Sequence, residues 1–315
     1  MRSARVTTMG HGHAHSHAPA PDADRRRLVA ALGLVLAFMG VEVAVGLLAS
    51  SLALLADAAH MLTDAGALAF ALVAMRLAAR PPAGGYTFGL KRAEILSAQL
   101  NGATLLATSL FIVYEGIRRL VDPPDVEGLP VLVVALLGGL VNLAAAALLA
   151  RASRRSLNVE GAMLHVLLDT AASLAAVAAG LAVLLTGFTR ADGLAALFVA
   201  ALMLKAAYGL LRDSGRVLLE AAPKGLDPQR IGEAMAAAPD VAEVHDLHVW
   251  EVTSGFPALS AHVLVAPGDD CHAKRRELET MLRRDFGIDH TTLQIDHEHT
   301  SELLAIEAPN GGSAS

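Results

Sequence analysis

Two identical arrangements of histidine and aspartate lie in an otherwise apolar part of the chain. His60 and Asp64 are four residues apart, and so are His165 and Asp169. In a helix this spacing places both side chains on one face, one turn apart. Imidazole nitrogens and carboxylate oxygens bind divalent transition metals, and four such ligands suit tetrahedral zinc. The two pairs therefore predict a metal site for zinc, with cobalt, cadmium and nickel as alternatives.

A simpler explanation is that each histidine only forms a hydrogen bond with its own aspartate. An aspartate within a membrane span costs roughly 2.5–3.5 kcal/mol on insertion scales, so it needs a partner or a water-lined cavity. The repetition of the same costly pair in two separate segments argues against the simpler explanation. The apolar segments contain no HExxH motif, so the general base of a zinc protease is missing from the pattern.

The elements that must position these pairs are long apolar segments. The sequence is 54% hydrophobic and 18% charged, with a mean hydropathy of +0.49, which is too apolar for a soluble domain of this length. Crossing ~30 Å of hydrocarbon takes about 20 helical residues. We expect six membrane helices, with the pairs in the second and fifth, near residues 28–49, 53–79, 95–120, 129–151, 160–186 and 191–212.

The distribution of Lys and Arg predicts the orientation of these helices. Basic residues concentrate before the first span and in the segments after the second, fourth and sixth spans. By the positive-inside rule these segments and both termini are cytoplasmic. The second and fifth spans then run in opposite directions, so the two pairs can face each other. Their similar flanks, HMLTDAGALA and HVLLDTAASLA, favour an inverted repeat.

The chain after residue 213 has the composition of an ordinary soluble domain. Asp227 is placed to cap a helix that ends near Ala238. Strands are expected at 244–253, 258–266 and 290–296, with a helix at 272–286 before the last of them. The order αββαβ predicts a ferredoxin-like α+β domain of two layers. We expect a His-rich cytoplasmic arm, a transport domain, a cytoplasmic domain and a flexible tail at residues 1–27, 28–212, 213–300 and 301–315.

Four segments resemble signature regions of the cation diffusion facilitator family, in its branch of bacterial zinc efflux transporters. The second helix of that family is similar to SLALLADAAHMLTDAGAL, the beginning of its third to YTFGLKRAEILSAQLNG, and its fifth to GAMLHVLLDTAASL. The first strand of its cytoplasmic domain is similar to HDLHVWEVTSG, and the resemblance extends in order over residues 25–300. It implies a transport site at His60, Asp64, His165 and Asp169, outward exchange of metal for protons, and a homodimer.

The resemblance also implies that the cytoplasmic domain binds zinc and contributes to dimerisation. By position His245, His262 and Asp296 correspond to metal ligands there, with His272 nearby on the following helix. Gln294 stands where other members carry a further histidine, which argues against a second ion. A surface domain also carries histidines that bind no metal, and this alternative stays open.

Three further features have two explanations each. Asp57, one turn before His60, either helps metal to approach from the outer face or caps the second helix at the membrane surface. Glu42 lies within the first span, where an ionisable residue predicts a function, either as a proton relay or as the partner of another polar side chain. His11, His13, His15 and His17 either gather metal weakly or form an unselective tail.

These patterns favour a secondary transporter that exports Zn²⁺ in exchange for protons by alternating access. Metal-bound imidazole is neutral and bound carboxylate is ionised, so metal and protons compete for the ligands, and histidine titrates near physiological pH. An intramembrane enzyme or a metal sensor are the alternatives, but no nucleophile, kinase, cyclase or DNA-binding signature accompanies the ligands. The net charge of -6 argues against nucleic acid. We expect a multi-pass protein of the inner membrane, surrounded by lipid.

Overall fold

The computed structural model describes residues 21–48, 52–122, 128–150 and 156–298. The chain forms two compact units, Met1–Ser214 and Gly215–Ser315, which are treated separately below. The histidines of the N-terminal arm and the tail after residue 298 lie outside the described residues.

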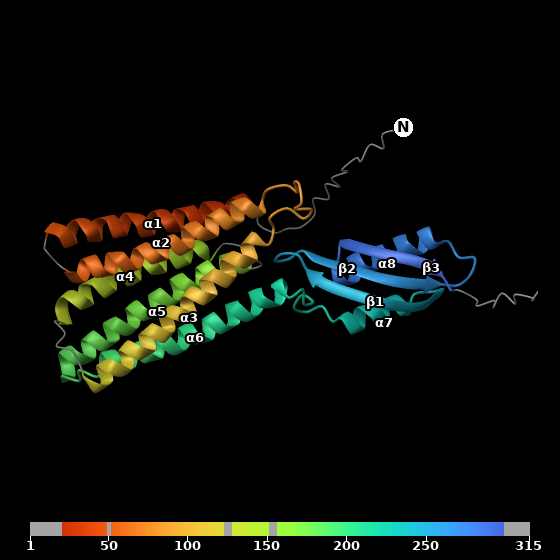
Figure 1. The fold of residues 1–315 in the computed structure, drawn as a ribbon. Coiled ribbons are helices and arrows are strands. Elements are labelled where there is room, and N and C mark those ends of the chain that lie inside the picture. The colour runs from red at the N-terminus through yellow and green to blue at the C-terminus, as the bar shows by residue number, and fades with distance from the viewer. Residues whose placement is uncertain (1–20, 49–51, 123–127, 151–155, 299–315) are drawn as a thin grey trace, which may run out of the picture. The chain divides into compact units, whose positions relative to one another are not determined.

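The first unit consists of six long helices, the last of which continues a few residues beyond the boundary at Ser214 (Figure 1). Each covers one of the six apolar segments to within two residues, so the expected helices are confirmed as helices. Among the described residues, α3, α5 and α6 are long and apolar enough to cross a membrane. The six helices are α1 (Pro21–Leu48), α2 (Leu52–Ala78), α3 (Ala93–Val121), α4 (Gly128–Leu149), α5 (Leu157–Thr186) and α6 (Ala191–Leu218).

Two helices extend well beyond the apolar segments that predicted them. The first begins at Pro21 instead of residue 28, and α6 continues to Leu218 instead of ending near residue 212. Polar residues continue both helices, and an ion pair between Arg27 and Asp24 at 3.1 Å stabilises the first turns of α1. Hydropathy therefore located the apolar part of each helix but not its ends.

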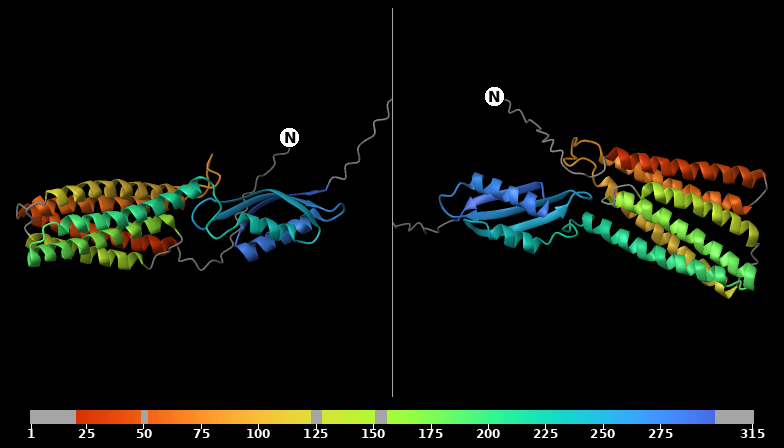
Figure 2. Two further views of the ribbon diagram at one scale, coloured as in Figure 1. Left: turned by 90° about the horizontal axis from the view of Figure 1, so that it is seen from below. Right: turned by 180° about the vertical axis from the view of Figure 1, so that it is seen from behind.

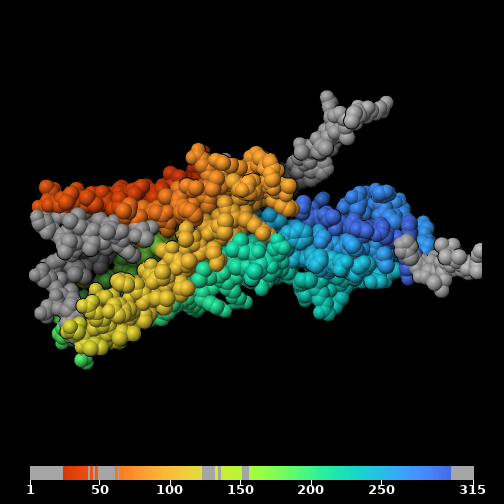
Figure 3. Space-filling model, viewed as in Figure 1, coloured from red at the N-terminus to blue at the C-terminus, as the bar shows by residue number. Residues whose placement is uncertain are grey.

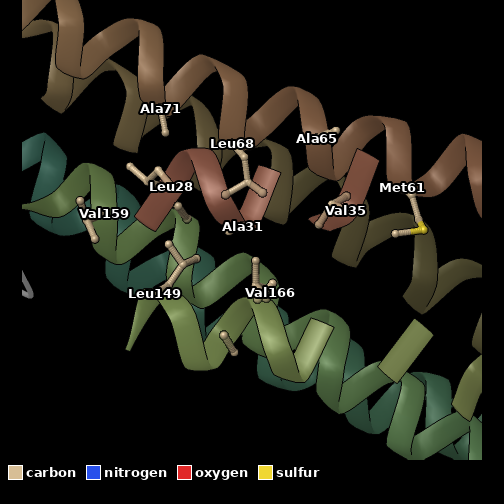
Figure 4. Packing of buried hydrophobic residues seen from close by; sticks show 13 residues of the cluster. Leu28, Ala31, Val35, Met61, Ala65, Leu68, Ala71, Leu149, Val159 and Val166 are labelled. Atoms are coloured by element: carbon tan, nitrogen blue, oxygen red, sulfur yellow. The ribbon is translucent and has the colours of Figure 1, made fainter. Parts of the chain in front are cut away.

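The helices pack around a core to which α1, α2, α4 and α5 all contribute. The first helix contacts α2 and α4, α4 contacts α5, and α3 contacts both α2 and α5 (Figure 2). Figure 4 shows how side chains of this core meet between α2 and α5, among them Leu68, Ala71, Val159 and Val166. The two helices that carry the histidine–aspartate pairs are thus neighbours in a packed interior.

Glycine allows α3 and α6 to approach each other closely. These helices lie side by side on one face of the first unit (Figure 3). A Cβ atom added at Gly193 of α6 would lie 3.0 Å from the backbone oxygen of Gly116 in α3 and 3.1 Å from the Leu120 side chain. A backbone oxygen cannot move aside as a side chain does, so only glycine fits this position without a shift of the helices.

Replacing Gly193 by alanine is therefore expected to destabilise the protein by about 1–3 kcal/mol, the usual cost of overpacking. The matched control is Gly138→Ala in α4, where an added Cβ meets no atom within 4 Å. There the better helix propensity of alanine should leave stability unchanged or raise it. Thermal unfolding of both variants in detergent measures the difference, and equal midpoints would contradict the close approach of α3 and α6.

The second unit has the αββαβ order expected from the sequence. Its elements are α7 (Pro228–Ala236), β1 (Val241–Glu251), β2 (Pro257–Val265), α8 (Cys271–Phe286) and β3 (His290–His297). The sheet has the order β1-β2-β3, with β2 antiparallel to β1 and parallel to β3. Both helices contribute to its core through Ile231, Met235, Leu278 and Leu282. The prediction of an α+β domain is confirmed.

The helices of this unit begin at aspartate caps. As predicted, Asp227 caps α7 by accepting a hydrogen bond from the backbone N–H of Gln229. Asp270 caps α8 and accepts from the backbone N–H groups of Ala273 and His272, which lower the pKa of the Asp270 carboxyl. The lowered pKa means that this cap is complete at neutral pH and weakens only as the carboxylate is protonated in acid.

Candidate metal centre

The first site joins α2 to α5 through the side chains of the two predicted pairs. His165 Nε2 of α5 lies 2.9 Å from Asp64 Oδ1 of α2 and forms a hydrogen bond with it. Asp169 Oδ2, one turn after His165, lies 3.7 Å from the same nitrogen. Ligand atoms of all three residues lie within 4.8 Å of one another. The structure therefore brings three of the four predicted ligands together at one point.

The spacing of these atoms is close to what a tetrahedral zinc ion requires. Zinc binds imidazole nitrogen and carboxylate oxygen at about 2.0–2.2 Å, which separates neighbouring ligand atoms by about 3.4 Å. The observed 2.9 Å and 3.7 Å lie on either side of that value. The distances from His165 Nε2 to the two carboxylates are thus compatible with a shared ion.

The same three side chains are buried, which gives the site its charge preference. The exposed fractions of the Asp64, His165 and Asp169 residues are 4%, 7% and 8%. Two carboxylates in such an environment are costly unless positive charge compensates them. A divalent cation supplies two positive charges and direct bonds to both carboxylates. Charge and donor atoms therefore both favour a divalent metal.

The arrangement bears on the simpler explanation of the repeated pairs at His165. If each histidine only satisfied its own aspartate, His165 would bond to Asp169 within α5. Instead its hydrogen bond crosses to Asp64 of the other helix. Two other polar residues near it on α5, Thr170 and Ser173, donate to carbonyl groups of their own helix. Shared contact between the two motifs is what a joint metal site requires.

Three predicted residues have side chains outside the described part of the structure. His60 belongs to α2, four residues before Asp64, and Asp57 lies in the same helix. Glu42 belongs to α1. Their roles as fourth ligand and accessory residues stay predictions.

A second cluster of metal-binding groups lies on the sheet of the second unit. His245 of β1 and His262 of β2 are directly paired across the strands, and their ring centroids are 5.3 Å apart. Asp246 joins them, with Oδ2 3.8 Å from His262 Nδ1. Ligand atoms of the three residues lie within 4.8 Å of one another, and all three are partly exposed or exposed. The predicted approach of His245 and His262 is confirmed.

The third residue of this cluster is one that sequence reasoning missed. Neighbouring side chains in a regular strand point to opposite faces, so Asp246 is not expected beside His245. The pairing of β1 with β2 shifts between His245 and His248, and Asp246 has φ of 50°. This irregularity changes the direction of the Asp246 side chain. The one signal in the sequence was the residue type, because aspartate adopts a positive φ more readily than most residues.

Asp296 and His272, which were predicted at this site, are not members of the cluster that the described residues form. Asp296 pairs with Leu264 in the sheet and accepts a hydrogen bond from Gln294 Nε2 at 2.8 Å. His272 lies in the first turn of α8, where its backbone N–H donates to Asp270. Participation of either residue in metal binding stays a prediction.

Comparison with known proteins covers both units. The chain matches the model of the cation efflux transmembrane domain over residues 28–219 and that of the cation efflux protein cytoplasmic domain over residues 223–298. A zinc transporter ZitB of Shigella flexneri is 41% identical over 92% of this chain and 94% of its own length. The ZitB protein of Pectobacterium atrosepticum is 39% identical over 89% and 88% of the two chains.

A further relative is described as exchanging several ions. The cadmium, cobalt and zinc/H(+)-K(+) antiporter of Bacillus subtilis is 36% identical, over 89% of this chain and 93% of its own. Two family models in succession, and relatives that align along nearly their whole length, leave one assignment. The chain belongs to the cation efflux family, also known as the cation diffusion facilitators.

Proposed function

We propose that this protein exports Zn²⁺ from the cytoplasm in exchange for protons by alternating access, with Cd²⁺, Co²⁺ and Ni²⁺ as further substrates. The observation that carries the proposal is the buried contact of Asp64 with His165 and Asp169 across two helices. His60, one turn from Asp64, is the fourth ligand. The similarity to a zinc transporter and to a cadmium, cobalt and zinc/H(+)-K(+) antiporter supports the same conclusion.

Competition for one atom explains how the two ions are coupled. A nitrogen and a carboxylate oxygen 2.9 Å apart share a proton between them. Whichever of the two atoms holds that proton, it must leave before both can bind a metal. Metal and proton are therefore alternative occupants of the site. Metal loading from the cytoplasm releases protons, and protons on the other side displace the metal.

The membrane placement follows from the apolar helices and the basic segments. We infer that the first unit spans the inner membrane, in contact with lipid, with both termini in the cytoplasm. The excess of Lys and Arg in the segments on one side supports this orientation. The metal then enters from the side that carries the C-terminal unit.

The cytoplasmic unit is proposed to bind zinc as a regulatory ion and to contribute to a homodimer. His245, Asp246 and His262 supply two nitrogens and a carboxylate that a zinc ion accepts. Asp296 and His272 remain candidates for completing the site. Its partial exposure suits an ion that exchanges with the cytoplasm, in contrast to the buried site of the first unit.

Zinc flux into sealed vesicles tests the proposed function. Purified protein in liposomes that enclose a zinc-sensitive dye should accumulate zinc when the lumen is acidic. An intramembrane enzyme and a membrane sensor both predict no net flux. Each metal is then tested in turn at the same pH difference. Failure of the wild-type protein to accumulate any of these metals would reject the proposal.

Counting bound zinc ions tests the cytoplasmic site. His245→Ala and His262→Ala should each lower the number of tightly bound zinc ions per chain, because each removes one of the nitrogen ligands. Equilibrium dialysis with metal analysis measures the count. His248→Ala is the matched control, since His248 lies on the same strand but outside the cluster. A wild-type count of bound zinc ions in both His245→Ala and His262→Ala would contradict zinc binding by this cluster.

A further inference from the structure

A second hydrogen bond joins α2 to α5 away from the metal ligands. Asn158 Nδ2 of α5 donates to the backbone oxygen of Ala71 in α2 at 2.9 Å. Both residues are fully buried. Ala71 has only a methyl side chain, which lets the asparagine reach the backbone of the neighbouring helix. The contact is thus a direct polar link between the two helices that carry the transport ligands.

The two links between α2 and α5 are equally spaced on both helices. Asn158 precedes His165 by seven residues, and Ala71 follows Asp64 by seven residues. Seven residues are about two helical turns, or ~10.5 Å, and return to the same face of a helix. Because the helices run in opposite directions, the His165–Asp64 and Asn158–Ala71 bonds form two rungs at matching heights. A slide of either helix along its axis would break both.

The contact surface between these rungs is apolar. Leu68 on α2 (Figure 4) and Ala162 on α5 are each 1% exposed and belong to the same core cluster. Apolar side chains gain little from one another in lipid, which is itself apolar, so packing alone fixes the axial position of a membrane helix weakly. Polar bonds at defined atoms fix it more sharply.

Stability alone does not explain an asparagine at this position. The second polar atom of the same amide, Asn158 Oδ1, is buried and has no hydrogen-bond partner among the described residues. A buried polar atom without a partner is costly. Leucine has the same branched shape and carries no such atom, although its side chain is larger than that of asparagine. The amide is therefore better explained by a role in positioning α2 against α5 than by a contribution to the stability of the fold.

We propose that Asn158 is a positioning residue that keeps α2 and α5 in register while the ligands change occupants. The inference rests on the proposed transport site. The His165–Asp64 bond must open whenever zinc replaces the shared proton, so this rung is absent in the loaded state. The amide of Asn158 neither titrates nor binds the ion, and its bond to Ala71 persists. Asp64 therefore stays level with His165 and Asp169 throughout the cycle.

The test is Asn158→Leu in reconstituted full-length protein. The expected result is a thermal midpoint close to that of the wild type, together with a KM for zinc raised by about tenfold, the lower end of what is lost when a group that orients a metal ligand is removed. The Zn²⁺:Cd²⁺ rate ratio should change as well, because the two ions differ in size. The matched control is Asn142→Leu, a half-buried asparagine of α4, which should leave KM unchanged.

Several outcomes would overturn the inference. These are a wild-type KM in Asn158→Leu, a fall in maximal rate at unchanged KM, or an equal rise of KM in Asn142→Leu. If Asn158→Leu does not fold, Asn158→Ser, whose hydroxyl is too short to reach Ala71, replaces it. A raised KM then supports the inference, and an unchanged KM overturns it. Wild-type transport that survives in Asp64→Ala would instead reject the transport site itself, so the two failures are distinguishable.

Discussion

Replacing Asp64 or Asp169 by alanine is expected to abolish zinc uptake into proteoliposomes while leaving a folded protein. Each change removes one of two buried carboxylates, and with it a ligand and half of the negative charge that balances a divalent cation. Loss of Asp64 also removes the hydrogen-bond partner of His165 across the helices. Uptake is measured with the enclosed dye at a fixed pH difference, and folding by gel filtration and thermal unfolding.

Asp192→Ala serves as the control for a lost carboxylate. Asp192 lies in the first turn of α6, where it forms an ion pair with Arg119 of α3 at 2.6 Å. Its side chain is partly exposed, and it takes no part in the cluster. This variant should keep its transport rate. Undiminished uptake in Asp64→Ala or Asp169→Ala would show that the ion crosses elsewhere.

Zinc accumulation is also expected to stop when the pH difference across the membrane is removed. Protons compete with zinc for His165 Nε2 and the carboxylates, so an acidic lumen is what releases the metal there. Addition of a proton ionophore to loaded vesicles should end uptake within the time needed for the gradient to dissipate. The dye signal before and after addition measures the effect.

A potassium gradient imposed at equal pH is the informative control. The relative from Bacillus subtilis is described as exchanging zinc with both protons and potassium. The site described for this chain offers two carboxylates and an imidazole, and the nitrogen ligand binds protons but suits potassium poorly. Uptake should therefore not be sustained by potassium alone. Sustained uptake under that condition would contradict exchange of zinc for protons at this site.

The parts of the structure that sequence predicted well are those that depend on local periodicity. Two pairs four residues apart in long apolar segments predicted one face on each of two opposed helices. The contact of His165 with Asp64 is the consequence. Helix ends were predicted less well, because polar first turns such as that of α1, with its Asp24–Arg27 pair, carry no hydropathy signal.

What the sequence did not reveal depends on pairing between distant segments. The register shift that brings Asp246 beside His262 arises where β1 and β2 meet, and neither strand alone encodes it in an obvious pattern. The Asn158–Ala71 link is similar, since a backbone oxygen as acceptor leaves no trace in the side-chain sequence. Both features require the neighbouring element to be in place before they can be recognised.

The burial of Asp64 and Asp169 in one site affects how costly each occupancy state of the site is. In the proposed mechanism, a site that holds neither metal nor added protons keeps two carboxylates away from water, which is costly. In the proposed mechanism this desolvation cost disfavours the return of an empty site and so helps to couple proton entry to zinc release.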